Sequence, residues 1–362
     1  MRKICVYAIS KNEEKFVNRW YDSVKEADDI YVLDTGSTDN TVEMLKKLGV
    51  NVSIKEITPW RFDVARNESL KMVPSDADAC VCIDLDEVLN PGWRNELEKS
   101  WKDDTTRLRY TYNWKLDSNN KPLISFLYEK IHSRNDYKWT HPVHEVLEYI
   151  GKDKENFVLN ENIVLNHYPN PNKSRSEYLP LLELSVKEDP SDDRNMHYLG
   201  REYMYYGKWN EAIDTLKKHL KLEKATWKDE RCASMRFIGR CYKELNEIEK
   251  AREWLNKAII EAPYLRDPYA ELLVLEYSNG NYKEAISLGE KALKINKNTK
   301  SYINEQFSND DVIYDLLSIC YYYEKDLNNS LYYINKALEI RPNDDRLKEN
   351  KKIVEEEIKF SN

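Results

Sequence analysis

The chain has few glycines, 9 among 362 residues, and none of them falls in a G-x-G-x-x-G pattern. That pattern shapes the phosphate-binding turn of dinucleotide-binding domains, so its absence argues against an NAD- or FAD-binding fold. Long apolar runs are missing from the start of the chain as well. The opening stretch, MRKICVYAIS, is too short in apolar residues for a signal peptide or a spanning helix. We therefore expect no membrane span and a cytoplasmic location.

An excess of positive charge is likewise absent. The net charge is −8 and both signs are mixed along the chain, so neither a nucleic-acid-binding surface nor a polybasic membrane anchor is indicated. The cysteines lack the close spacing of metal-binding motifs. Two of them lie within an apolar segment, where buried thiols are usual, and we expect all of them to be reduced. The cysteines are Cys5, Cys80, Cys82, Cys232, Cys241 and Cys320.

The character of the sequence changes near residue 170, and a length of 362 residues fits two domains. Before that point, short apolar strands alternate with amphipathic helices, which is typical of a mostly parallel sheet covered by helices. The order strand, helix, strand, helix, strand, helix, strand is that of a nucleotide-binding half-sheet. Strands are expected at residues 3–9, 30–33, 50–54 and 79–83, and helices at 13–24, 40–48 and 63–72.

After residue 170 the sequence is helical and repetitive. Small residues recur where the second helix of each unit begins, and again twelve positions before it. This pattern resembles the tetratricopeptide repeat of about 34 residues, in which small residues let paired helices approach closely. Extra loop is expected at 223–229 and 296–309, and a capping helix at about 344–359. The aligned positions are Ala212, Ala251, Ala285 and Ser330, preceded by Gly200, Gly239, Leu273 and Ser318.

The predicted architecture is thus an α/β domain followed by an all-α repeat solenoid. The α/β domain is expected over residues 1–170 and a linker helix over 171–192. About four repeats and the capping helix are expected over 193–362. A boundary at this place separates two regions that each have their own apolar residues, as independent domains require.

The segment Asp84-Leu85-Asp86-Glu87 follows directly on the apolar strand expected at 79–83. Ligands of open α/β sheets bind where strands end. Since residues two apart in a strand point the same way, Asp84 and Asp86 are expected to present two carboxylates to one point. Such a pair suits a hard divalent cation that also holds a phosphate. The alternative interpretation is a solvated turn, because the pattern D-x-D alone is common.

Five motifs follow one another in the first half of the chain: ISKNEE (9–14), VLDTGSTDNT (32–41), FDVARNESL (62–70), IDLDEVL (83–89) and PVHEVL (142–147). They occur in the order seen in family-2 glycosyltransferases of the Rossmann-like GT-A fold, which residues 1–170 resemble. Bacterial and phage members with a C-terminal tetratricopeptide array, including peptide S-glycosyltransferases, are most similar. The resemblance implies transfer of a sugar from a nucleotide-sugar donor, expected to be a UDP-sugar, to an acceptor nucleophile with inversion, using Mn²⁺ or Mg²⁺.

By this resemblance Asp86 is the metal ligand, and Asp84 contacts the donor ribose or shares the metal. Asp34 ends the second expected strand, from where its carboxylate can accept a hydrogen bond from uracil or ribose. The alternative role, capping the turn at Gly36, fits Asp39 better. The remaining donor contacts are expected from Ile9, Ser10 and Arg66.

The segment 141–145, His-Pro-Val-His-Glu, is the second concentration of reactive side chains. Glu145 is expected to be the base that removes the acceptor proton, and Glu87 is its rival because it adjoins the acidic motif. Either His144 or His167 is expected to complete the metal shell. Imidazole is an acceptable ligand for Mn²⁺ and is not preferred by Mg²⁺.

We expect a metal-dependent glycosyltransferase whose repeats bind a peptide, protein or other macromolecular acceptor, or mediate homodimerisation. One alternative is an inactive glycosyltransferase-like scaffold for protein association, against which the retained carboxylates argue. Another is a nucleotidyltransferase, which also uses paired carboxylates and a metal but needs phosphate-binding glycines or a basic cluster near the first strand. The sequence identifies neither the sugar nor the acceptor.

Overall fold

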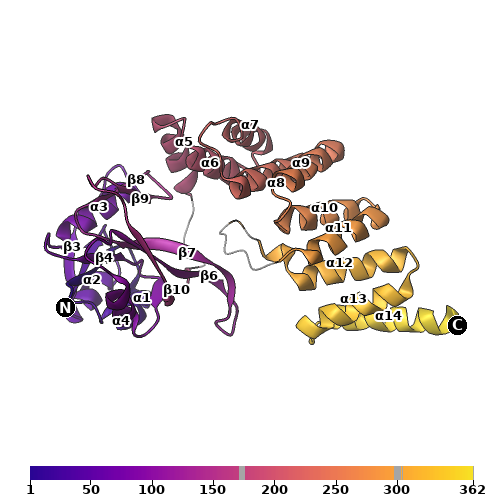
Figure 1. Cartoon of the computed structure of the whole chain (residues 1–362), viewed down its shortest axis with the longest axis horizontal. Coiled ribbons are helices and arrows are strands. Elements are labelled where there is room, and N and C mark those ends of the chain that lie inside the picture. Colours follow the sequence, from indigo (N-terminus) through magenta and orange to yellow (C-terminus); the bar gives the residue numbers. More distant parts are fainter. Residues whose placement is uncertain (171–175, 297–302, 304, 362) are drawn as a thin grey trace. The chain divides into compact units, whose positions relative to one another are not determined.

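The chain separates into two compact units, of which the first holds Met1–Glu188 and the second begins at Asp189. Strands and helices build the first unit, and helices build the second (Figure 1). The predicted order, an α/β domain followed by an all-α domain, is confirmed. Of the predicted linker helix, residues 171–175 lie outside the described residues, and α5 (Tyr178–Glu188) belongs to the first unit. The computed structural model describes residues 1–170, 176–296, 303 and 305–361.

An eight-stranded mixed sheet forms the centre of the first unit. One half is parallel: β1 lies between β2 and β4, and β3 lies outside β2. In the other half β7 runs antiparallel to β4 and to β6, β10 runs parallel to β6, and β5 closes the edge. In spatial order the strands are β3 (Asn51–Ile54), β2 (Asp29–Asp34), β1 (Ile4–Ser10), β4 (Ala79–Cys82), β7 (Pro122–His132), β6 (Arg107–Leu116), β10 (Phe157–His167) and β5 (Glu87–Leu89).

The mixed sheet corrects the expectation of a mostly parallel one. The parallel half matches the strands predicted from continuous apolar runs, since such runs mark strands that are covered on both faces. Strands β6 and β7 are longer and keep several residues exposed or half-exposed, which is the pattern of an antiparallel sheet that faces solvent on one side. Strands β6 and β7 therefore lack the continuous apolar run from which the parallel strands were predicted.

Helix α1 (Glu14–Val24) covers the sheet with the apolar face predicted from its spacing. Phe16, Val17, Trp20 and Val24 are buried and share one apolar cluster with residues of β1, β2 and β4. Full burial of such side chains contributes about 1.5–3 kcal/mol each, so this face fixes the helix on the sheet. The other helices of the sheet region are α2 (Thr41–Lys47), α3 (Phe62–Met72) and α4 (Trp93–Ser100).

The parallel register brings three strand ends to one edge of the sheet. Ser10 lies opposite Asp34, and Tyr7 lies opposite Cys82, so β1, β2 and β4 all leave the sheet on the same side. A separate two-stranded sheet, β8 (Tyr137–Thr140) with β9 (Val146–Tyr149), packs against α3. The segments that follow β1, β2 and β4, together with the loop between β8 and β9, supply the candidate active site.

Paired helices build the second unit, and the prediction of a helical repeat array is confirmed. Neighbouring helices pack together as α6 with α7, α8 with α9, α10 with α11 and α12 with α13. The predicted capping helix is α14. In the part of the chain that the structure describes, no helix is both long and apolar enough to span a membrane. The helices are α6 (Asp193–Tyr205), α7 (Trp209–His219), α8 (Lys228–Glu244), α9 (Ile248–Glu261), α10 (Asp267–Ser278), α11 (Tyr282–Lys294), α12 (Asp310–Tyr323), α13 (Leu327–Ile340) and α14 (Asp345–Ser361).

Small residues at the helix crossings permit a close approach. Ala251 on α9 is fully buried, and a Cβ atom placed on Gly239 of α8 would lie 3.4 Å from its carbonyl oxygen. The same Cβ would lie 2.9 Å from Cγ of Leu255. A larger side chain at either position would therefore force the two helices apart.

We predict that Ala251→Leu destabilises the repeat unit by about 1–3 kcal/mol, the usual cost of overpacking a filled interior. Glu249→Leu is the matched control, since this side chain on the same helix is 87% exposed and surface changes stay within about 0.5 kcal/mol. Thermal denaturation of both variants followed by circular dichroism measures the difference. Equal melting temperatures would contradict the close packing of α8 and α9.

Candidate active site

Asp34 organises the turn that follows β2. Its side chain is fully buried, and Oδ1 accepts hydrogen bonds from the N–H groups of Gly36 (3.0 Å) and Ser37 (2.8 Å). Oδ2 accepts from the hydroxyls of Ser10 (2.8 Å) and Ser37 (2.5 Å). A carboxylate offers about four acceptor positions. All of these are used within the turn, so a donor nucleotide would have to replace one of the serine hydroxyls.

The prediction that Asp39 caps the Gly36 turn is therefore wrong. Asp39 instead accepts from the N–H (3.0 Å) and hydroxyl (2.5 Å) of Thr41, at the start of α2. The carbonyl of Ser10 accepts from both the N–H (2.9 Å) and the hydroxyl (3.0 Å) of Thr35. Ile9 pairs with Leu33 in the parallel ladder. The backbone around Ile9 and Ser10 thus holds the same turn in place.

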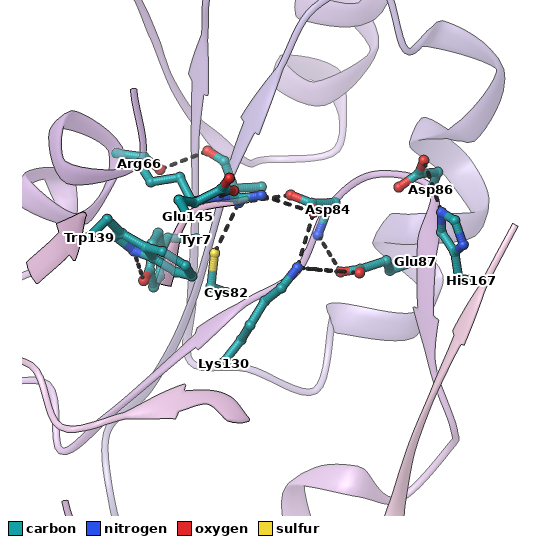
Figure 2. Close-up of polar contacts among 12 residues, drawn as sticks. Tyr7, Arg66, Cys82, Asp84, Asp86, Glu87, Lys130, Trp139, Glu145 and His167 are labelled. Atoms are coloured by element: carbon teal, nitrogen blue, oxygen red, sulfur yellow. Dashed lines mark hydrogen bonds and ion pairs between the residues drawn. The ribbon is translucent and has the colours of Figure 1, made fainter. Parts of the chain in front are cut away.

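Arg66 joins three separate parts of the chain (Figure 2). From α3, its buried guanidinium donates to both carboxylate oxygens of Asp84, at 2.8 and 3.0 Å. Its Nε donates to Glu145, and Nη1 lies 3.3 Å from Sγ of Cys82. The guanidinium carbon lies 5.1 Å from the ring centre of Trp139, in cation–π contact. Arg66 therefore fixes Asp84 and Glu145 relative to each other.

Lys130 on β7 holds the other side of Asp84 and was not predicted as a site residue. Its Nζ lies 3.1 Å from Oδ2 of Asp84 and 3.3 Å from Oε1 of Glu87. Glu87 is almost fully buried and also accepts from the hydroxyl of Tyr112 (2.8 Å) and the N–H of Asp84 (2.9 Å). Figure 2 shows the lysine between the two carboxylates.

The surroundings of Asp84 and Glu87 shift the pKa values of the two carboxyl groups in opposite directions. Burial by itself would raise the pKa of Asp84, but the charges of Arg66 and Lys130 outweigh it and hold that pKa well below the usual range. For Glu87, burial raises the pKa, with further upward contributions from Asp84 and Asp86 and a lowering by Lys130. Asp84 is accordingly a permanent anion, whereas Glu87 is the group that takes a proton more readily.

Asp86 faces His167 at the end of β10. The distance from Oδ2 of Asp86 to Nε2 of His167 is 3.6 Å, and Nδ1 lies 3.1 Å from the carbonyl oxygen of Trp114. The imidazole also stacks on the Trp114 ring, 4.5 Å between centroids. Burial opposes a positive charge on His167, but the contact with Asp86 prevails and raises the pKa. Because a carbonyl oxygen can only accept, Nδ1 carries the hydrogen and Nε2 is directed at Asp86.

Asp84 and Asp86 do not point to one place, which corrects the expectation from strand alternation. Strand β4 ends at Cys82, and the N–H of Glu87 donates to the carbonyl of Asp84 (2.9 Å) in a turn. Figure 2 shows Asp84 turned toward Arg66 and Asp86 turned toward His167. Alternation of side chains holds only within a strand. The two carboxylates therefore have different partners.

Glu145 is positioned by a strained loop between β8 and β9. His141 and His144 both have left-handed backbone, with φ of 75° and 51°, which is uncommon for residues other than glycine. The carbonyl of Pro142 accepts from the N–H of Phe62 (2.9 Å), which ties the loop to the start of α3. The His144 ring packs beside Tyr178, 5.8 Å between centroids. Strain of this kind is often found at functional sites.

Two family models match the chain. Glycosyl transferase family 2 matches residues 5–152, and Tetratricopeptide repeat matches residues 237–262. The first unit thus carries a family-2 glycosyltransferase domain, and the second carries tetratricopeptide repeats. The first match spans all the labelled side chains of Figure 2 except His167.

Several relatives with curated names are glycosyltransferases. An uncharacterized glycosyltransferase of Rickettsia typhi is 36% identical over 99 residues, which cover 27% of this chain and 32% of that protein. The SPbeta prophage-derived glycosyltransferase SunS of Bacillus subtilis is 27% identical over 225 residues, which cover 58% of this chain and 51% of that protein. The chain therefore spans a third to a half of the length of these relatives. Among solved structures, the crystal structure of MamA matches 49% of this chain and 99% of its own, with 22% identity and a TM-score of 0.38.

We predict that Lys130→Met lowers stability by about 3–5 kcal/mol at neutral pH, since it leaves the buried Glu87 carboxylate without its counter-charge. The loss should shrink toward pH 5. Burial places the folded-state pKa of Glu87 above its unfolded value, so falling pH protonates Glu87 in the folded variant first and removes the unpaired charge.

Lys138→Met is the matched control, because this lysine pairs with Glu148 at the surface and its side chain is 50% exposed. Its effect should stay below about 1 kcal/mol at both pH values. Urea denaturation at pH 7 and pH 5 makes the comparison. Similar losses in the two variants would show that Lys130 does not support the acidic cluster.

Proposed function

We propose that this protein transfers a sugar from a nucleotide-sugar donor, with UDP as the expected nucleotide, to an acceptor nucleophile. The observation that carries the proposal is the placement of two side-chain groups at one sheet edge. One is the pair of Asp86 and His167, and the other is the charged cluster centred on Arg66. The match of this unit to family-2 glycosyltransferases supports the assignment. Sugar transfer from a diphosphate needs both charge stabilisation and a base.

The chemistry of Asp86 and His167 fits a divalent cation. A carboxylate oxygen and an imidazole nitrogen face each other, and the second ring nitrogen is held by a carbonyl, as is usual for histidine ligands. An oxygen and nitrogen set suits Mn²⁺ better than Mg²⁺. A bound cation would supply stabilisation of the negative charge on the diphosphate leaving group. His167, and not His144, is therefore our candidate for the second ligand.

Asp84 and Arg66 are proposed to orient the donor. Asp84 stays ionised at all pH values near neutrality, so it can accept a hydrogen bond from a ribose or sugar hydroxyl. Its carboxylate is 28% exposed even though Arg66 and Lys130 hold it. Asp34, Ile9 and Ser10 shape the neighbouring turn and remain candidates for contacts with the base.

Glu145 is the proposed base for the acceptor. Its carboxylate is bound to Arg66, which fixes its direction. Glu87 is enclosed by Lys130, Tyr112 and the backbone of Asp84. A carboxylate with all its partners inside the protein supports its neighbours and is poorly placed to meet an acceptor. The repeats are proposed to bind a peptide or protein acceptor, or a second copy of the chain.

Asp86→Asn tests the metal assignment. An amide is a weaker ligand than a carboxylate, so we expect transfer and donor hydrolysis to fall on the order of 10³-fold, with Mn²⁺ affinity lost in calorimetric titration. Treatment of the unmodified protein with EDTA should mimic the variant, and Mn²⁺ should restore activity. Full activity in the variant or in chelator would reject the metal site at Asp86.

Glu145→Gln tests the base. Glutamine keeps the shape and can still accept from Arg66 but cannot take a proton, so we expect transfer to fall about 10²–10⁴-fold while donor affinity is retained. Glu148→Gln, an exposed position on β9, is the control and should leave the rate unchanged. If Glu87→Gln shows the expected profile and Glu145→Gln does not, the roles of the two carboxylates are exchanged.

A further inference from the structure

A short segment between α11 and α12 lies against the face formed by α8 and α10. The carboxylate of Glu305 accepts from Nη1 of Arg236 (2.6 Å) and from Nη1 (3.1 Å) and Nη2 (2.5 Å) of Arg240. The N–H of Glu305 donates to Asp267 (2.8 Å), and Arg236 also donates to the carbonyl of Ile303 (3.4 Å). One carboxylate is thus held by a fork of two arginines, which is the geometry of a bound acidic ligand.

An aromatic ring of the same segment completes the contact. The guanidinium carbon of Arg240 lies 5.3 Å from the ring centre of Phe307 and 5.2 Å from that of Phe237. The arginine therefore contacts two aromatic rings, one from the helix face and one from the segment. Such cation–π contacts contribute about 0.5–2 kcal/mol each, depending on exposure.

The arginine pair is not part of the repeat framework. When the units are aligned on Gly200, Gly239, Leu273 and Ser318, none of the other units carries both arginines, although the first unit has an arginine at the second position. Helix packing alone therefore does not require two arginines here. The aligned residues are His197 and Arg201 in the first unit, Ala270 and Val274 in the third, and Asp315 and Ile319 in the fourth.

The charges of this face are balanced without the segment. Arg236 and Arg240 also contact Glu271, at 3.3 Å from Arg236, and Asp267 lies 3.9 Å from Arg236. When Glu305 leaves, the two arginines therefore still contact Glu271 and Asp267. No buried charge is left without a partner of opposite sign. Arg240 is 25% exposed and Glu305 is 30% exposed, which places the contact at the solvent edge. The carboxylate of Glu305 can therefore be replaced by that of another ligand.

We propose that Glu305 and Phe307 act as an internal ligand, and that the face of α8 and α10 binds partner peptides carrying a carboxylate followed two residues later by an aromatic ring. The internal segment then competes with the partner. Because it is tethered, its effective concentration is on the order of millimolar, and only a partner that outcompetes it gains access. The inference does not depend on the proposed sugar transfer.

The test uses the full chain and a fluorescent peptide with the sequence of residues 303–309, INEQFSN. In fluorescence anisotropy, the double variant Glu305→Ala with Phe307→Ala should bind the peptide at least tenfold more tightly than the unmodified chain. A peptide with glutamine in place of its glutamate should bind at least tenfold more weakly. Arg240→Gln added to the double variant should abolish binding.

Glu276→Ala is the matched control, since it breaks another buried arginine–glutamate contact, the one between the C-terminal end of α10 and Arg252 on α9. It should not increase peptide binding. Circular dichroism checks folding, and if the double variant melts early, the isosteric Glu305→Gln replaces it. Equal affinity of the double variant and the unmodified chain, or equal binding of the two peptides, would overturn the proposal. So would peptide-induced dissociation of a dimer of the unmodified chain, which would make a second copy the source of the bound segment.

Discussion

The buried guanidinium of Arg66 is the interaction on which the candidate active site depends. Transfer of such a charge from water into a protein interior costs several kcal/mol, and only partners with good geometry compensate it. Asp84 and Glu145 provide these partners, and the ring of Trp139 adds a cation–π contact. The planar fork leaves little freedom to the groups it holds. The exit of β4, the helix α3 and the loop before β9 are therefore fixed as one unit.

Much of this arrangement could be predicted from the sequence, because the signals were local. Continuous apolar runs identified the parallel strands, and the motif residues Arg66, Asp84 and Glu145 do lie together at the ends of those strands. Lys130 was missed because it comes from an antiparallel strand that reaches the acidic segment only through its pairing with β4, which is distant in sequence. The divergence of Asp84 and Asp86 was missed because the strand ends at Cys82.

The two units use arginine in contrasting ways. Arg66 is enclosed, with its side chain 5% exposed, and its removal would leave Asp84 with Lys130 alone and take the arginine partner from Glu145. Arg240 is at the solvent edge between Glu271 and Glu305, so one carboxylate can leave while the other remains. The first arrangement is suited to rigid positioning of reacting groups, and the second to reversible binding.

The contact between Lys130 and Asp84 has a consequence for the order in which the domain is completed during synthesis. Asp84 is made 46 residues before Lys130, and Glu87 is made 43 residues before it. While the ribosome adds residues one after another, the acidic edge of the parallel strands has no lysine to neutralise it, and domains generally fold as units as they emerge. The parallel half therefore cannot reach its final state as an early, self-sufficient intermediate. The negative charge of Asp84 and Glu87 gains its lysine counter-charge only when β7 has been made, although most of the glycosyltransferase motifs are made earlier.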